Sequence, residues 1–505
     1  MDIRYNVGAL RAQKSVDGKP DFLLTNRDGS YYSSNGDVQH GGWFVREQDT
    51  LFRVLAEVRI AAPKVSTIEH RLYSVVQYRN DVRENFFLPF KERALVYTVR
   101  PTTDVDLVLD VRKTSDESSK RRFYDVMADD DCTLITFTKE DAKPFFIAVN
   151  MKGKALNKWE KRYYGVSARA VCRAVRLHGS RFVITAGMDR AQVLRDNNRI
   201  SQNLPSLVAA QRKYAGTFTR ISIDRAVASF ALDSFVSYNQ GTISGFSEHD
   251  ELFALRAMLL LGEKDFVWKV LFRQLRALQP NGLLPGADVG SSCLLFLRAK
   301  DFLERSQDGR ALVEEKLVHT IEKFHAHHTK NGLAWGQAEG ARSRASIELQ
   351  ASRLALYKLA FALTKNSLYR DNEEKLRLSV RELFWNGHML ADGLADFTPR
   401  TNVFLTAYIY PELLSAEEWK TCFVSVLNAL EHCPLADHCV NNIAAIVMHR
   451  VAPQFFKNHI TNIYSASRDE LLWRGCVGMP SEKLDGDVSV LSAATFVELC
   501  NELGK

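Results

Sequence analysis

Carboxylates at the start of an apolar helical stretch are the side chains best placed for chemistry. The segment Phe246–Glu251 contains Glu248, His249, Asp250 and Glu251. A carboxylate accepts two hydrogen bonds from hydroxyl groups with a fixed geometry, which suits the binding of a hydroxyl-rich ligand. The same segment also suits a structural role, because Asp250 can cap the helix and Glu251 lies near the positive end of the helix dipole.

Two further side chains have the chemistry of a binding site. Trp335 follows a turn at Asn331–Gly332 and precedes Gly336 and Gln337. An indole in this position can stack on the ring face of a ligand, and the alternative is a core aromatic. Glu348 lies near a predicted helix start, where it either binds a ligand or satisfies backbone donors of the helix.

The cysteines and histidines do not indicate a metal centre. The best group is His432-Cys433 with His438-Cys439, but its spacing matches no common zinc pattern and Pro434 lies inside it. A loop at a helix end with buried thiols is the preferred interpretation. Eight cysteines without a disulfide spacing indicate reduced thiols in a cytoplasm. We therefore expect no metal and no cofactor.

Composition indicates a soluble globular protein of two domains. The chain has 505 residues, of which 46% are hydrophobic and 25% charged. The net charge is +7 and no basic block stands out beyond Lys120–Arg122, so we expect no nucleic-acid partner. We also expect no membrane span, because no run approaches about 18 apolar residues, and no signal peptide, because the first residues lack an apolar core. The composition does not indicate an oligomeric state.

The first half of the chain has the pattern of an antiparallel sheet. Short segments rich in β-branched or aromatic residues alternate with turn clusters, and few helices are long enough for βαβ crossovers. The expected strands are 54–60, 95–99, 105–111, 133–137, 145–149 and 181–186. We predict a β-sandwich over residues 1–215, ending in a helical connector from about Asp189 to Tyr214 with a break at Pro205.

The second half has helical periodicity. Ser415 and Glu418 form a capping box, and about twelve amphipathic helices are readable. Among them are 250–261, 265–279, 291–304, 309–329, 345–364, 372–385, 437–451 and 488–503. No strict repeat supports a regular solenoid, so we predict an (α/α)6 toroid barrel over residues 216–505. The fold class is thus α+β multidomain.

Several short motifs occur in the order found in one enzyme family. Residues 22–31 and 159–165 resemble strands of that family's N-terminal domain, and 282–285 matches its Gly-Leu-Ile-Pro loop. The best match is 347–351, Ile-Glu-Leu-Gln-Ala, for its Val-Glu-Ile-Gln-Ala helix start. Residues 400–402 and 473–478 resemble an Arg-Pro-Asn motif and a Trp-Arg-Gly-Pro-Val-Trp element. The chain therefore resembles glycogen-debranching, amylo-α-1,6-glucosidase-type glycoside hydrolases, as a divergent member.

The resemblance implies a set of substrate-binding residues. Asp250 falls where the family grips sugar hydroxyls in the −1 subsite, and His249 replaces the family's Arg. The other residues expected to hold the sugar are Trp335, Gln337, Glu348, Arg400 and Trp473.

The resemblance also defines where the catalytic carboxylates are expected. Gln337 replaces the family's general acid, and an amide cannot deliver a proton to a glycosidic oxygen. Our acid candidate is Glu339, two residues further on. A base is expected near the 473–478 element, where Glu470, Glu482, Asp485 and Asp487 are available, and we favour Glu482 or Asp487.

Two functions follow from these expectations. The first is an inverting, exo-acting α-glucosidase-like enzyme on short α-glucans or a related glucoside. The second is a catalytically degenerate barrel that binds carbohydrate or serves as a scaffold, which the changes at Gln337 and Gly478 favour. A helical protein adaptor has little support in the sequence.

Overall fold

The chain folds into two compact units, which are described separately. The computed structural model describes residues 1–34, 41–116, 121–128, 131–140, 142–164, 167–219, 222–238, 240–243, 248–336, 344–430, 437–482 and 487–505. Unit 1 comprises Met1–Gln240 with Glu470–Pro480, and unit 2 comprises Gly241–Asp469 with Ser481–Lys505. The domain boundary between residues 215 and 216 stays a prediction. Within the described residues, no helix has the length and apolar character needed to cross a membrane.

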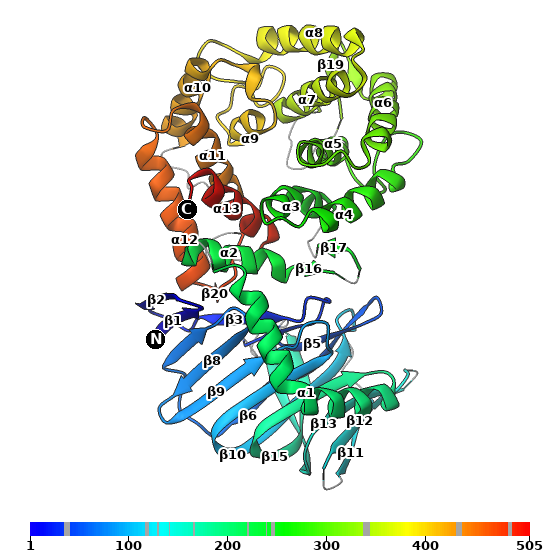
Figure 1. Cartoon of the computed structure of the whole chain (residues 1–505), viewed down its shortest axis with the longest axis vertical. Helices are drawn as coiled ribbons and strands as arrows, with labels where there is room; N and C mark the ends of the chain where they lie inside the picture. The colour runs from blue at the N-terminus through cyan, green and yellow to red at the C-terminus, as the bar shows by residue number, and fades with distance from the viewer. Residues whose placement is uncertain are drawn as a thin grey trace. The chain divides into compact units, whose positions relative to one another are not determined.

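Unit 1 is built on one large, mostly antiparallel sheet (Figure 1). Its strands are β1 (Asp2–Val7), β2 (Leu10–Ser15), β3 (Asp21–Thr25), β4 (Tyr31–Ser33), β5 (Gly42–Glu47), β6 (Thr50–Ile60), β7 (Thr67–His70), β8 (Ser74–Arg79), β9 (Val82–Phe87), β10 (Ala94–Lys113), β11 (Arg122–Ala128), β12 (Thr133–Lys139), β13 (Phe145–Val149), β14 (Gly153–Tyr164), β15 (Ser167–Gly187) and β20 (Cys476–Val477). All six predicted strand segments lie within these strands. The parallel exceptions among the described pairings are β1 with β7 and β20 with β3.

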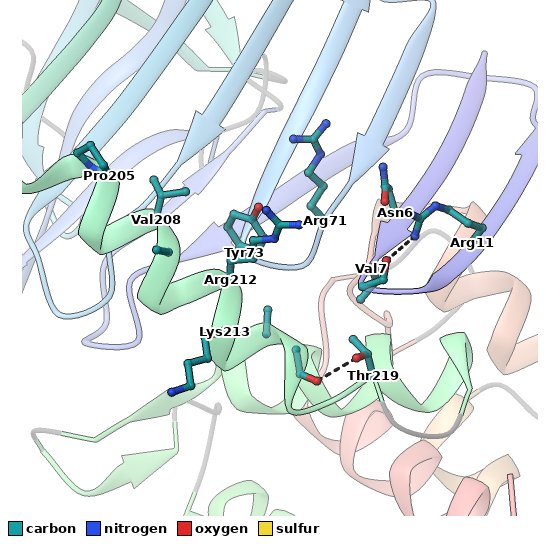
Figure 2. A pocket seen from close by; sticks show the side chains of 14 residues that line it. Asn6, Val7, Arg11, Arg71, Tyr73, Pro205, Val208, Arg212, Lys213 and Thr219 are labelled. Atoms are coloured by element: carbon teal, nitrogen blue, oxygen red, sulfur yellow. Dashed lines mark hydrogen bonds between the residues drawn. The ribbon is translucent and has the colours of Figure 1, made fainter.

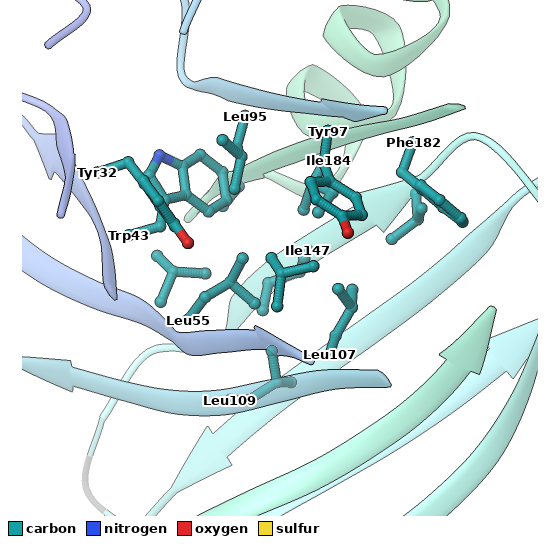
Figure 3. Packing of buried hydrophobic residues seen from close by; sticks show 14 of the residues in the cluster. Tyr32, Trp43, Leu55, Leu95, Tyr97, Leu107, Leu109, Ile147, Phe182 and Ile184 are labelled. Carbon is teal, nitrogen blue, oxygen red and sulfur yellow. The ribbon is translucent and has the colours of Figure 1, made fainter. Parts of the chain in front are cut away.

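The long strands β10 and β15 organise this sheet. β10 pairs with β9 through its first part, with β6 through its second part, and with β15 along most of its length. Alternate side chains of β10, from Leu95 and Tyr97 to Leu107 and Leu109, point into the main core, which Figure 3 shows. The neighbouring Val96 faces the other side and packs in a second cluster. Successive side chains in this part of β10 therefore pack on opposite faces of the sheet.

Helix α1 (Arg190–Gly216) covers the second face and runs through Pro205 without a break. The predicted break is therefore wrong. Ile200 and Leu204 pack against Val96 and its neighbours on the sheet, and Asn197 Nδ2 donates to Val183 O at 2.8 Å. Gln211 Nε2, beyond the proline, donates to Leu88 O at 2.8 Å. Contacts on both sides of Pro205 thus compensate for the hydrogen bond that a proline cannot donate. Unit 1 also contains α2 (Ile223–Ser234) and β16 (Val236–Ser237).

A buried charge cluster lies inside unit 1. The Asp110 side chain is fully buried and accepts from Arg53 NH1 at 3.0 Å, Arg112 Nε at 3.2 Å and Arg122 NH1 at 2.8 Å. Burial acts to raise the pKa of Asp110, but the three guanidinium groups outweigh it and leave that pKa lowered. The carboxylate is thus the shared counter-ion of three buried arginines.

Unit 2 is helical. Its helices are α3 (Glu248–Leu260), α4 (Lys264–Ala277), α5 (Val289–Leu303), α6 (Arg310–His327), α7 (Ile347–Thr364), α8 (Ser367–Phe384), α9 (Asn402–Ile409), the 3-10 turn η1 (Pro411–Leu413), α10 (Ala416–Leu430), α11 (His438–Val451), α12 (Lys457–Trp473, whose residues from Glu470 on fall in unit 1) and α13 (Val490–Glu502). Short strands β17 (Thr242–Ile243), β18 (Thr329–Lys330) and β19 (Leu333–Ala334) complete it. Each helix range predicted from the sequence matches a helix of the structure. The capping box is also confirmed, because Ser415 N donates to Glu418 Oε2 at 2.8 Å and Glu418 N donates to Ser415 Oγ at 3.3 Å.

Alternate helices of unit 2 form a closed ring (Figure 1). Helices α3, α5, α7, α9, α11 and α13 contact one another in that order, and α13 contacts α3 again. Helices α4, α6, α8 and α10 each pack on a ring helix next to them in the chain. The chain is therefore a mixed α/β protein with a large sheet and a helical ring.

Paired charges cross-link the interior of the ring. Tyr408 in α9 donates to Glu498 Oε2 in α13 at 2.6 Å, and Arg256 Nε in α3 lies 3.4 Å from the same oxygen. Arg298 in α5 pairs with Asp301 at 2.9 Å. Burial raises the pKa of Glu498, while Arg256 and Arg298 act against the rise. The contacts to Glu498 join α3, α9 and α13, whereas the Arg298–Asp301 pair lies within α5.

Candidate functional site

The connections before the ring helices mark one end of unit 2. Each of the ring helices α3, α5, α7, α9 and α11 is followed by a short connection, at residues 261–263, 304–309, 365–366, 410–415 and 452–456. The connections that lead into the next ring helix are longer: 278–288, 328–346, 385–401, 431–437 and 474–489. Because successive helices reverse direction, the ring helices all begin at the end where the longer connections lie. Most of the predicted site residues are at this end.

Glu348 lies in the first turn of α7 and is buried. Ile347 N donates to Asp392 O at 3.0 Å, which brings the connection before α9 against the start of α7. Burial raises the pKa of Glu348 to about 7, and the negative charge of Asp392 adds to the rise. Its Oε2 has no hydrogen-bond partner among the described residues. A carboxyl group that keeps its proton near neutral pH has the property that a general acid needs.

Arg400 holds Asp392 beside Glu348. Its NH1 contacts the Asp392 carboxylate and lies 2.9 Å from Asp396 Oδ2, and Asn402 Nδ2 donates to Asp392 Oδ1 at 2.8 Å. The guanidinium group that the resemblance assigned to the sugar is therefore already paired with two carboxylates. Sequence reasoning missed Asp392. The only signal was an acid eight residues before Arg400, which is also common in solvated loops.

Replacing Glu348 with Gln should remove a pH-dependent cost to folding. Because burial raises the pKa from 4.5 to about 7, the folded protein binds this proton more tightly than the unfolded chain. Stability contributed by the protonated group is complete below about pH 4.5 and is lost as the pH rises to about 7. We expect the free energy of unfolding of Glu348→Gln to exceed that of the wild type by about 3 kcal/mol at pH 8. This difference should vanish toward pH 4.5.

Urea unfolding at several pH values measures this difference. The matched control is Glu382→Gln, which changes an exposed carboxylate on α8 and should leave the pH profile of stability as it is in the wild type. If the stability gained by Glu348→Gln does not change with pH, the gain does not come from the loss of an ionisable carboxyl group at residue 348.

Asp250 and His249 lie in the first turn of α3, and Asp250 is buried. His249 Nδ1 lies 3.9 Å from Asp250 Oδ1, and its ring lies 5.8 Å from the Phe253 ring. Desolvation raises the pKa of the Cys439 thiol at the start of α11 to about 12, and the charge of Asp250 contributes. Asp250 therefore lies close to where α11 begins.

Glu251 has a structural role. Its carboxylate accepts from Ile243 N at 3.0 Å, Arg273 NH2 at 2.6 Å and Gln274 Nε2 at 2.9 Å. The side chain is buried and ties α3 to α4. This role comes from hydrogen bonds to neighbouring elements, whereas the sequence suggested an interaction of Glu251 with the helix dipole.

Glu482 and Asp487 lie on one loop before α13. Glu482 N donates to Asp487 O at 2.9 Å, and His438 N donates to Glu482 O at 3.0 Å. A bridge between Ser481 and Val488 closes the loop at its base. Both acidic residues are exposed. The backbone thus fixes Glu482 against the start of α11, and both Glu482 and Asp487 lie at the surface.

Trp335 follows a hairpin that is fixed to α7. Gln350 accepts from Ala334 N at 2.8 Å and donates to Ala334 O at 2.8 Å. The indole is half-buried, and Lys330 Nζ lies 4.5 Å from its ring centroid. Lys330 thus forms a cation–π contact with the indole.

The remaining predicted residues either lie outside the described residues or belong to unit 1. Gln337, Glu339 and the side chain of Glu248 lie outside the described residues. Trp473 belongs to unit 1, where it is buried and packs edge-on against Tyr5 at 5.5 Å. Its role in a sugar site stays a prediction.

No metal-binding group is found among the described residues, since no three His, Cys, Asp or Glu side chains converge there. Of the group considered in the sequence, His432 and Cys433 lie outside the described part of the chain. His438 lies against Ser467, with 3.5 Å between Nδ1 and Oγ, and Ser467 donates to Asn442 Oδ1 at 2.8 Å. These contacts belong to the packing between α11 and α12.

The chain resembles one solved structure over its whole length. A bacterial glucoamylase complexed with acarbose matches with a TM-score of 0.64 and 10% identity, covering 100% of this chain and 98% of that chain. A rhamnosidase from Klebsiella oxytoca with rhamnose bound matches at a TM-score of 0.47 and 10% identity, covering 90% and 95%. No family model matches the sequence, and no curated protein matches it either. At this identity the glucoamylase match shows the fold alone.

Proposed function

We propose that the protein is a glycoside hydrolase that acts on α-glucosidic linkages in short α-glucans or a related glucoside. The observation that carries the proposal is the buried Glu348, whose raised pKa and proximity to Asp392 give it the properties of a catalytic acid. The fold supports it, because the glucoamylase that it resembles is complexed with acarbose. In this proposal, unit 1 is the β-sandwich and the ring of unit 2 is the core of the (α/α)6 barrel.

An inverting mechanism needs an acid and a base on opposite sides of the scissile bond, with carboxyl groups ~6.5–9.5 Å apart. Glu348 would protonate the glycosidic oxygen, and Glu482 would accept a proton from the attacking water. Asp487 on the same loop is the alternative base, and Glu339 stays proposed as the alternative acid. Asp250, His249 and Trp335 would hold the sugar.

The second candidate is a carbohydrate-binding protein without hydrolytic activity. Gly478 replaces the Trp of the related element and has φ +85°, and a Cβ there would lie 2.7 Å from His70 Nε2. A Trp is therefore excluded at this position by the packing of unit 1. Together with Gln337 at the position of the family's acid, this change favours a site that has lost catalytic groups.

Assays with maltotriose separate the two candidates. We expect the wild type to hydrolyse maltotriose with inversion. Proton NMR measures this by identifying the anomer of the released glucose. Glu482→Gln should lower kcat by about 10²–10⁴-fold, with acarbose binding retained. Asp487→Asn and Glu339→Gln test the alternative base and acid, and Glu417→Gln, an exposed carboxylate on α10, is the control.

The outcomes distinguish the candidates clearly. Saturable binding of maltotriose and acarbose without any turnover would show that the protein binds carbohydrate and does not hydrolyse it. If the wild type hydrolyses maltotriose and Glu482→Gln, Asp487→Asn and Glu339→Gln all keep wild-type turnover, the protein is a hydrolase. The catalytic roles assigned to these three residues are then wrong. If maltotriose and acarbose are not bound and maltotriose is not hydrolysed, both candidate functions are wrong.

A further inference from the structure

A positively charged cleft lies in unit 1, on residues that the proposed function does not use. Its volume is about 800 Å³, and its walls come from the β1–β2 connection, the turn between β7 and β8, and the second half of α1 (Figure 2). This is within the ~300–1,000 Å³ of small-molecule sites. The cleft is therefore large enough for a small organic ligand.

The polar lining of the cleft is cationic. Arg11, Arg71, Arg212 and Lys213 contribute to its walls, and no Asp or Glu is among the described residues that line it. Figure 2 shows Arg212 extending from α1 toward the strands that carry Arg71, whereas Lys213 extends the other way, at the margin. Such a concentration of one sign of charge in a concave surface attracts ligands of the opposite sign.

Two of these arginines are held in position by the protein. Arg71 Nε donates to Glu69 Oε1 at 2.7 Å, and the same oxygen accepts from Asn6 Nδ2 at 3.2 Å. Arg11 NH1 donates to Gly8 O at 2.7 Å and Leu10 O at 2.8 Å. Both guanidinium groups keep other N–H groups beyond these bonds, since each has five. Fixed donors reduce the entropy that a ligand must overcome on binding.

The dipole of α1 explains the position of only some of the cationic side chains at the cleft. Cations in the last turn of α1 are stabilised by the negative end of its dipole, which accounts for Lys213. It does not account for Arg11 and Arg71, which come from other elements. Arg212 has no ion-pair partner among the described residues. Arg71 is already paired with Glu69, with 2.6 Å between Arg71 NH2 and Glu69 Oε1. Arg11 and Arg212 are therefore the cationic groups that a bound anion would neutralise.

We propose that this cleft binds a small organic anion carrying at least two phosphoryl or carboxylate groups. Arg212, Arg71 and Arg11 form charge-assisted hydrogen bonds to the anionic oxygens. The Tyr73 hydroxyl and the Asn6 amide lie in the same lining and contribute neutral polar groups. The ligand is thus distinct in chemistry from a neutral glucan, and the inference does not depend on the proposed hydrolase activity.

Isothermal titration calorimetry on the full chain tests the proposal, with pyrophosphate and citrate as probes and neutral maltotriose for comparison. We expect at least one anion to saturate with a Kd of about 1 mM or lower. Arg212→Glu should weaken this binding by about tenfold or more, because it removes a charge-assisted donor and adds repulsion. Arg190→Glu, at an exposed position on the same helix outside the cleft, should change it by less than about twofold.

Comparison of the two probes identifies the anionic group. Tighter binding of pyrophosphate indicates phosphoryl chemistry, tighter binding of citrate indicates carboxylates, and either supports the proposal. Failure of both to saturate by about 10 mM would overturn it. Equal weakening by Arg212→Glu and Arg190→Glu would also overturn it, because the effect would then come from net charge alone.

Discussion

Glu348→Gln should lower kcat for maltotriose by about 10²–10⁴-fold while leaving acarbose binding within about tenfold of the wild type. A Gln has nearly the same shape as a protonated Glu but cannot donate a proton to the leaving oxygen. Because Glu348 is buried and its pKa is raised to about 7, the wild type holds the acid form across the mildly acidic range. Activity of the wild type should therefore fall as the pH rises above about 7.

The pH profile and a matched variant separate catalysis from structure. Glu382→Gln on α8 removes an exposed carboxylate of the same unit and should keep wild-type kcat and the same alkaline limb. Unfolding at pH 8 shows whether Glu348→Gln is folded, and there we expect it to be the more stable protein. Wild-type kcat in a folded Glu348→Gln would mean that another group protonates the substrate, with Glu339 the next to test.

Asp110→Asn should destabilise the protein by about 3–5 kcal/mol, the largest effect that we expect on folding. The carboxylate is fully buried and is the shared partner of Arg53, Arg112 and Arg122. An amide removes the negative charge and keeps the volume, so three buried guanidinium groups lose their ion pair with Asp110. The expected loss of stability therefore comes from the negative charge of Asp110 and not from its volume.

Thermal and urea unfolding of the full chain measure this loss. The control is Asp125→Asn, which changes an exposed carboxylate on β11, and we expect it within about 0.5 kcal/mol of the wild type. Because the folded protein holds the pKa of Asp110 below its usual range, the contribution should persist above the unfolded pKa and be lost as the pH falls through the lowered value. A loss below about 1 kcal/mol would show that solvent or other anions compensate for the three arginines.

Local pattern predicted most of the secondary structure. Along β10, Leu95 and Tyr97 lie in the main core and Val96 lies in the second cluster, because successive side chains of a strand point to opposite faces. The capping box at Ser415 and Glu418 needs only residues three apart, and its two hydrogen bonds are formed. Such signals depend on neighbours in the chain, so they can be read without the fold.

Pairings between distant segments required the tertiary structure. The sequence identified Glu348 and Arg400, but only the packing of the 385–401 connection against α7 brings Asp392 close to Glu348. The fold of that connection pairs Arg400, a predicted sugar ligand, with Asp392 and Asp396. The sequence also predicted a break at Pro205, which contacts of α1 with the sheet override.

The sequence by itself therefore determined the elements and several candidate carboxylates, because periodicity and side-chain chemistry are local properties. The tertiary structure decided the properties of those carboxylates. Burial and the charge of Asp392 raise the pKa of Glu348, whereas Glu251 is taken up by hydrogen bonds to Ile243, Arg273 and Gln274. Desolvation and Coulomb energy depend on distances between segments far apart in the chain, and no local pattern encodes them.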